Sequence, residues 1–208
     1  MTASWRWLDD DPDGAIKEAA TELAQGNCVV FPTDTVYGLL AAITAGDAYK
    51  QIYRIKHRPT GKPLALLSSH AHPLNIAVSA ALEAWPDATR EYSRGTLTVI
   101  VSEADLPTDA IPHAVASCQP GPLGVRLPYD RWTQQLLTAL GGLAWATSVN
   151  KSGQSPAVTI QQLQNWSTEL GDVQPALIVA RRQPLAGTPS RLANLESGNL
   201  RRLDRAPT

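Results

Sequence analysis

Short apolar runs alternate along the chain with segments whose apolar residues recur every three or four positions. The apolar runs predict buried strands at residues 28–31, 64–67, 97–101, 124–127, 143–147 and 176–180. The periodic segments predict helices at residues 12–25, 47–56, 74–84, 130–140 and 159–170. This alternation indicates an α/β fold.

Prolines and glycines interrupt the pattern. Pro32 ends the first apolar run, and because proline has no N–H for a sheet ladder, we expect the chain to leave the sheet there, with Thr33 and Thr35 exposed. Gly38 then permits a tight turn. We expect the proline-rich residues 107–122 to be irregular, and the polar, arginine-rich residues from 187 onward to form a tail.

Length and composition limit the possible classes of protein. The chain has 208 residues, 43% of them apolar, so we expect residues 1–208 to form a single domain. The formal net charge of −1 argues against a protein that coats nucleic acid, so any anion site has to be local. Two cysteines are too few for a disulfide framework. No segment resembles a signal peptide or a membrane span, and we expect a soluble cytoplasmic protein.

Residues 48–82 are locally cationic, because they contain lysines and arginines but no aspartate or glutamate. Lys50 and Arg54 fall on the polar side of the predicted helix, where a solvated basic surface is the simpler interpretation. Lys56, Arg58 and Lys62 instead flank the following loop, where their side chains can converge on a ligand. Arginine supplies a planar fork and lysine a mobile charge, so this group suits a polyphosphate.

Other polar residues follow or interrupt the apolar runs. Residues 148–153 directly follow a predicted strand, where open α/β sheets bind ligands, although an ordinary turn has the same composition. Arg126 is a charged residue within another predicted apolar strand. A buried arginine can be explained equally well by a structural salt bridge or by contact with a ligand. His70 and His72 fit a solvated loop better than a metal site, and we expect no structural metal.

The sequence contains no Gly-rich phosphate loop, dinucleotide fingerprint or nucleophile elbow. A nucleotide would therefore have to be held by side chains across a cavity. The residues by themselves predict an anion-binding α/β domain, and a nucleotide enzyme in particular.

Several motifs, in this order and at these spacings, carry a family resemblance. They are Pro32-Thr33-Asp34-Thr35-Val36-Tyr37-Gly38, Lys56-x-Arg58-Pro59, Lys62-Pro63-Leu64, Gly124-Val125-Arg126-Leu127-Pro128, Ala146-Thr147-Ser148-Val149-Asn150-Lys151-Ser152-Gly153 and Pro189-Ser190. From about residue 14 to residue 205 the chain resembles the YrdC/TsaC family of threonylcarbamoyl-adenylate synthases. The resemblance implies a YrdC-like open, twisted, mixed α/β sheet with flanking helices around a large positively charged cavity.

The resemblance also implies an enzyme of transfer-RNA modification. It would condense L-threonine, bicarbonate or CO₂, and ATP into L-threonylcarbamoyl-AMP, with release of pyrophosphate. ATP would arrive with Mg²⁺, and a separate transferase complex would carry the threonylcarbamoyl group to adenosine 37 of transfer RNA. The family's catalytic tetrad corresponds to Lys56, Arg58, Ser148 and Asn150. The tetrad would bind ATP together with Lys62 and Arg202, and L-threonine would be held by Thr33, Thr35, Arg126 and Ser190.

Some positions depart from the family pattern. Residues 94–98 are Arg-Gly-Thr-Leu-Thr where Pro-Gly-Pro-Leu-Thr is usual, Leu67 stands where many members have histidine, and Arg191 replaces a frequent threonine. Two alternatives therefore stay open. One is a divergent paralogue similar to YciO, with altered or lost synthase activity. The other is a module that binds transfer RNA or double-stranded RNA through its cationic cavity.

Overall fold

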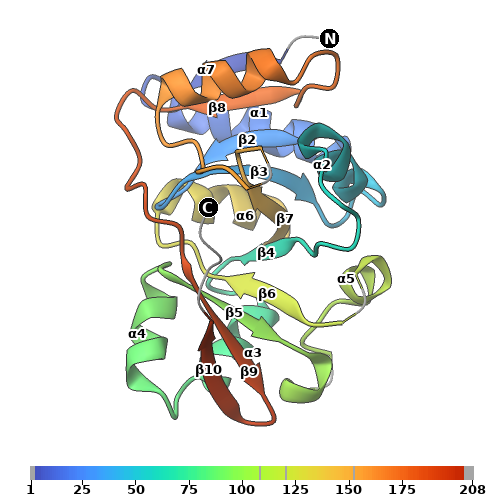
Figure 1. Ribbon diagram of the computed structural model, residues 1–208, viewed down its shortest axis with the longest axis vertical. Coiled ribbons are helices and arrows are strands. Elements are labelled where there is room, and N and C mark those ends of the chain that lie inside the picture. Colours follow the sequence, from blue (N-terminus) through green and yellow to red (C-terminus); the bar gives the residue numbers. More distant parts are fainter. Residues whose placement is uncertain (1–2, 108, 120, 152, 204–208) are drawn as a thin grey trace.

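Ten strands of the described chain form one mixed sheet. The structure is a computed structural model that describes residues 3–107, 109–119, 121–151 and 153–203. Across the sheet the strands follow the order β1-β8-β2-β3-β7-β4-β6-β5-β9-β10, with both parallel and antiparallel pairs (Figure 1). Their bounds are β1 Ser4–Trp7, β2 Val29–Pro32, β3 Tyr37–Ala42, β4 Ala65–Ser68, β5 Leu97–Val101, β6 Leu123–Arg126, β7 Leu143–Ser148, β8 Leu177–Ala180, β9 Arg191–Glu196 and β10 Asn199–Leu203. The predicted open, mixed α/β sheet is confirmed.

Helices cover both faces of this sheet. Their bounds are α1 Pro12–Ala24, α2 Ala48–Lys56, α3 Pro73–Ala81, α4 Pro86–Ser93, α5 His113–Cys118, α6 Arg131–Ala139 and α7 Ile160–Glu169, with a 3₁₀ turn η1 at Glu103–Asp105. Phe31 of β2 belongs to one buried cluster with Leu23 of α1, whereas the preceding residue, Val30, belongs to a second cluster with Ile52 of α2 and Leu163 of α7. Successive strand residues point to opposite faces, so the strand is buried on both. No helix within the described residues is long and apolar enough to cross a bilayer.

The helix starts follow local capping chemistry. Asp11 accepts a hydrogen bond from the N–H of Gly14 at 3.0 Å, and Asp130 accepts one from the N–H of Thr133 at 2.9 Å. Thr159 and Gln162 form a capping box at the start of α7, because each side chain accepts from the backbone N–H of the other residue. These helices therefore begin where the sequence places them.

Several segments differ from the sequence-based expectation, which included neither β1 nor α4. Gly38 lies inside β3, paired with Phe31 and Ser148, so the turn is made by residues 33–36 instead. Helix α5 lies within residues 107–122, which were expected to be irregular. Pro112 precedes the helix, so its missing N–H removes no hydrogen bond within the helix. Residues 191–203 form the β9–β10 hairpin rather than a tail, because Ala193 and Leu195 alternate with polar residues and are buried in the core.

Candidate active site

A cavity of about 580 Å³ opens over the middle of the sheet. Ala146, Ala65 and Gly124 are register neighbours on β7, β4 and β6, and their small side chains form part of its wall. Nine of the ten predicted site residues line this cavity: Thr33, Thr35, Lys56, Arg58, Lys62, Arg126, Ser148, Asn150 and Ser190. Among the described residues, the lining includes four cationic side chains and no carboxylate. The site therefore favours anionic ligands.

The end of α2 brings Lys56 and Arg58 to the same cavity. His57 adopts a left-handed conformation with φ 47°, and the N–H of Arg58 donates to the carbonyl of Tyr53 at 2.9 Å. This closure reverses the chain directly after the last helical residue, and Pro59 prevents the helix from continuing. Two cations that lie two residues apart can therefore contact one ligand.

Lys56 is only 5% exposed, and oxygen atoms surround its Nζ. Nζ donates to Asn150 Oδ1 at 2.8 Å, to Thr147 Oγ1 at 3.1 Å and to the carbonyl of Ser148. Burial, together with two neighbouring cations, lowers the pKa of Lys56 to about 7, whereas the three acceptors favour the ammonium. Lys56 is thus fixed in position while its charge is sensitive to a bound anion.

Arg58 is held by the backbone of its own loop. Its Nε donates to the carbonyl of Lys62 at 3.1 Å, and its Nη2 donates to the carbonyl of Pro63 at 2.7 Å. Burial lowers the pKa of Arg58 from its ordinary value. The loop and the guanidinium therefore position each other beside the exposed side chain of Lys62. Lys50 and Arg54 are exposed and lie outside the cavity lining, as the solvated interpretation predicts.

The loop after β7 carries the predicted hydroxyl and amide. Ser148 Oγ donates to Asn150 Oδ1 at 2.8 Å, and the Asn150 amide nitrogen donates to the carbonyl of Gln154. The oxygen of Asn150 thus accepts from both Ser148 and Lys56, which orients the amide. The loop lies in the cavity wall at the end of β7, and its role in binding a ligand stays a prediction.

Thr33 and Thr35 form the turn between β2 and β3. Thr33 Oγ1 donates to the carbonyl of Val36 at 2.7 Å and lies 3.2 Å from Thr35 Oγ1. The expectation that both threonines are exposed is wrong: they are 5% and 4% exposed. The reason is tertiary, because the N–H of Gly187 bonds to the carbonyl of Thr35 at 2.9 Å and brings a distant segment over the turn.

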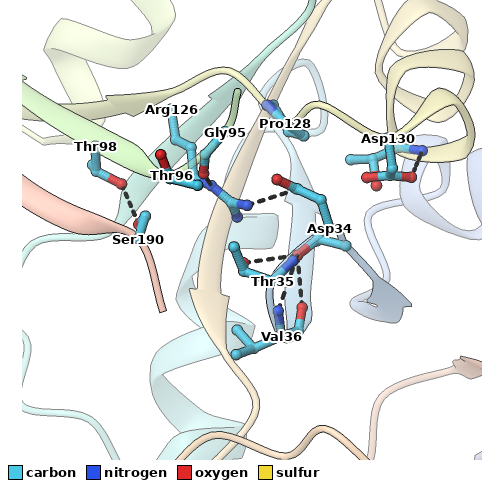
Figure 2. Close-up of polar contacts among 12 residues, drawn as sticks. Asp34, Thr35, Val36, Gly95, Thr96, Thr98, Arg126, Pro128, Asp130 and Ser190 are labelled. Carbon is cyan, nitrogen blue, oxygen red and sulfur yellow. Dashed lines mark hydrogen bonds and ion pairs between the residues drawn. The ribbon is translucent and has the colours of Figure 1, made fainter. Parts of the chain in front are cut away.

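Arg126 forms a buried ion pair with Asp34, and it also lines the cavity (Figure 2). Arg126 Nη2 lies 2.7 Å from Asp34 Oδ1, and Nε donates to the carbonyl of Gly95 at 2.9 Å. Burial raises the pKa of the Asp34 carboxyl, which the charge of Arg126 opposes. Ser190 and Thr98 share a hydrogen bond of 2.7 Å, and Thr98 is the register neighbour of Arg126. Arg126 therefore combines a salt bridge with access to a ligand.

Arg202 is the one predicted site residue that the structure places away from the described cavity lining. It lies on β10, and its guanidinium nitrogens are 2.8 and 3.1 Å from the carboxylate of Glu91 on α4. Elsewhere, His72 Nδ1 accepts from the N–H of Leu74 and caps α3, while His70 is exposed. Within the described ranges, no three His, Cys, Asp or Glu side chains gather as a metal site would require.

Sequence reasoning does not single out three residues of this site. Asp34 sits inside the quoted motif of residues 32–38, so its place between two threonines is the signal that could have found it. Thr98 is a hydroxyl in an apolar strand, which is a weaker signal. Thr147 gives no local signal, because its contact with Lys56 joins residues far apart in the chain.

The arrangement offers two kinds of anion recognition in one cavity. Lys56, Arg58 and Lys62 suit phosphate oxygens, since they combine mobile charges with a planar fork. Arg126 suits a carboxylate, and hydroxyl groups of Thr35 and Ser190 lie in the same wall. The cavity can therefore hold a polyphosphate and a second, smaller anion at once.

The chain is similar to known proteins in sequence and in fold. A threonylcarbamoyl-AMP synthase from Bos taurus is 29% identical over 156 residues, which are 73% of this chain and 52% of that protein. The chain thus spans about half the length of the mammalian relatives that it matches. P. abyssi Sua5 complexed with L-threonine has a TM-score of 0.69 and 23% identity, covering 89% of this chain and 52% of that one.

E. coli YciO is a second solved structure with the same fold. Its TM-score is 0.74 at 21% identity, and the match covers 99% of this chain and 98% of YciO. A family model for Sua5, YciO and YrdC, described as telomere recombination, matches residues 21–205. Because that match takes in nearly all of the sheet and every residue of the cavity lining, the chain belongs to the Sua5/YciO/YrdC family.

Proposed function

We propose that the chain is an L-threonylcarbamoyl-adenylate synthase, which converts L-threonine, bicarbonate or CO₂, and ATP into threonylcarbamoyl-AMP and pyrophosphate. The observation that carries the proposal is the pairing of a three-cation group, Lys56, Arg58 and Lys62, with Arg126 in one cavity. The mammalian relatives bear the name of this activity, and P. abyssi Sua5 has been solved with L-threonine.

The reaction has two bond-forming steps. The threonine amine attacks CO₂ and loses a proton, which yields a carbamate; from bicarbonate, that proton leaves with hydroxide as water, and no further proton is released. A carbamate oxygen then attacks the α-phosphorus of ATP, and the bond from this phosphorus to the bridging oxygen breaks as pyrophosphate leaves. Negative charge therefore shifts from the carbamate toward the leaving group. Cations placed along that path stabilise the transition state more than the reactants.

The residues divide between the two ends of the reaction. Lys56, Arg58 and Lys62 would bind the phosphates and the leaving pyrophosphate, with Ser148 and Asn150 hydrogen-bonding the nucleotide. L-Threonine would place its carboxylate on Arg126, within reach of the hydroxyl groups of Thr33, Thr35 and Ser190. Positioning and charge stabilisation account for such a reaction without a dedicated general base.

The wider context of the reaction is part of the same proposal. Mg²⁺ would enter with ATP as the counter-ion of its phosphates, and a transferase complex would consume the product on transfer RNA. We further propose that residues 1–208 form a single domain, because β1, near the start of the sequence, pairs with β8, near its end, at one sheet edge.

The direct test is ATP-dependent pyrophosphate release with L-threonine and bicarbonate, each omitted in turn, with the product mass checked for threonylcarbamoyl-AMP. Arg58→Ala should slow release by on the order of 10²-fold or more without loss of the fold. Arg54→Ala is the matched control, because Arg54 lies four residues earlier, in the last turn of α2, and is exposed. Near-wild-type turnover of a folded Arg58→Ala protein would refute the assignment.

A second candidate is a paralogue without synthase activity. The observation that favours it is the match to E. coli YciO over nearly the full length of both chains. In that case ATP would bind but no adenylate would form with L-threonine. Binding of RNA in the absence of any ATP chemistry, weakening steeply with salt, would instead favour an RNA-binding module.

A further inference from the structure

The buried ion pair between Asp34 and Arg126 does more than neutralise charge. The side chains of Arg126 and Asp34 are only 8% and 13% exposed, and their closest atoms are 2.7 Å apart. Asp34 comes from the turn between β2 and β3, whereas Arg126 comes from β6, on the far side of β7 and β4 in the sheet. The pair therefore connects the turn that carries Thr33 and Thr35 to the central strands.

Gly95 completes the arrangement. Its carbonyl accepts from Arg126 Nε at 2.9 Å, and its φ of +73° turns the backbone toward the pair (Figure 2). A Cβ at this position would lie 2.1 Å from Asp34 Oδ2, so only glycine leaves room for the carboxylate. Asp34 and Gly95 thus hold the guanidinium at two of its nitrogens.

The rest of the guanidinium is available to a ligand. An arginine has five N–H donors, and the contacts with Gly95 and Asp34 use two of them. Within the part of the chain that the structure describes, Nη1 of Arg126 makes no hydrogen bond, and Arg126 lines the cavity. Its register neighbours are Leu67 on β4 and Thr98 on β5, so Arg126 projects from the middle of three paired strands. The contacts with Gly95 and Asp34 set the orientation of its guanidinium.

We propose that Asp34 is a positioning residue for the amino-acid substrate, which orients Arg126 so that its Nη1 side meets the substrate carboxylate. This inference rests on the proposed function, since it names how that site recognises an α-amino acid. A carboxylate on the Nη1 side stays apart from Asp34, whereas one that approached the occupied side would meet a like charge. The pair therefore fixes both the place and the direction of carboxylate binding.

Asp34→Asn is the first test, because it keeps the shape of the side chain and removes its charge. The KM for L-threonine should rise about tenfold or more, since an orienting charge-assisted hydrogen bond is lost, while kcat and the KM for ATP stay within about twofold. Asp34→Ser serves if the asparagine variant does not fold. Asp9→Asn is the matched control, because Asp9 forms a partly buried ion pair with Arg181 outside the cavity lining and should leave all three constants unchanged.

A double-mutant cycle separates positioning from a general structural role. If Asp34 acts through Arg126, then Asp34→Asn should change the L-threonine affinity less than about twofold in an Arg126→Ala background. An equal loss in both backgrounds, or a fall in kcat with an unchanged KM for L-threonine, would overturn the inference.

Calorimetric titration of L-threonine distinguishes this inference from the proposed function. If the wild-type protein binds L-threonine and Asp34→Asn weakens that binding about tenfold, the inference stands even when no adenylate forms, and only the proposed function fails. If the wild-type protein forms adenylate and Asp34→Asn binds L-threonine as tightly as the wild type does, only the inference is overturned. A wild-type protein that binds no L-threonine overturns both.

Discussion

Binding of ATP should make Lys56 take up a proton, because its charge depends on whether an anion is present. In the ligand-free site, burial and neighbouring cations lower the pKa of Lys56 to about 7, so the neutral amine, which can donate two of the three hydrogen bonds, becomes the main form by pH 8. A polyphosphate beside Nζ favours the ammonium and raises this pKa. The expected uptake at pH 8 is therefore most of one proton per ATP.

Isothermal titration calorimetry in two buffers measures this quantity directly. The apparent binding enthalpy is compared in Tris and HEPES at pH 8, and its slope against the ionisation enthalpy of the buffer gives the number of protons taken up. The phosphates of ATP are fully ionised at this pH, so they contribute little. Lys56→Met is the control, because methionine has a similar length but no titratable group, and its slope should be close to zero.

The result that refutes the reasoning is a wild-type protein that binds ATP at pH 8 with no dependence on the buffer. Equal slopes in the wild type and Lys56→Met would place the titrating group elsewhere. Asn150→Asp is an independent test. A carboxylate 2.8 Å from Nζ would keep Lys56 protonated before ATP binds, so the proton uptake on ATP binding should be abolished.

Two further substitutions test the surrounding structure. Gly95→Ala should destabilise the fold by about 3 kcal/mol or more, since its Cβ would displace Asp34 from a buried ion pair, whereas Gly46→Ala, also at positive φ but with open space, should cost only about 1–2 kcal/mol. Equal melting temperatures would contradict this packing. Arg202→Ala should change the Kd of ATP less than about threefold, because Arg202 pairs with Glu91 outside the cavity. A larger loss would mean that Arg202 leaves Glu91 when ATP binds.

Local patterns predicted most elements of the fold. The run at residues 28–31 is buried and leaves the sheet after Pro32, since an apolar stretch and a missing N–H act within a few residues. The capping residues of α1, α6 and α7 act over a similar distance. The β9–β10 hairpin was not predicted, because many of its residues are polar. Two signals in the sequence do indicate it: the Ser197-Gly198 turn and the alternation of apolar and polar residues around Ala193.

The sequence by itself determined which chemistry is present and which segments carry it. The clustering of Lys56, Arg58 and Lys62 after a helix, and the hydroxyl and amide at Ser148 and Asn150, are local features, and all five line the cavity. Their order and spacing also carried the family resemblance. Such features can be predicted because the residues concerned are close together in the chain.

Only the tertiary structure decided how these groups meet. The contact of Lys56 with Asn150 spans 94 positions and that of Arg126 with Asp34 spans 92, and no local pattern shows which residue pairs with which. These contacts exist because the register of non-consecutive strands brings distant loops to one cavity. The same packing buries Lys56 and so lowers its pKa. Charge state and orientation are therefore properties of the packed sheet, because each depends on desolvation and partners that the local sequence does not contain.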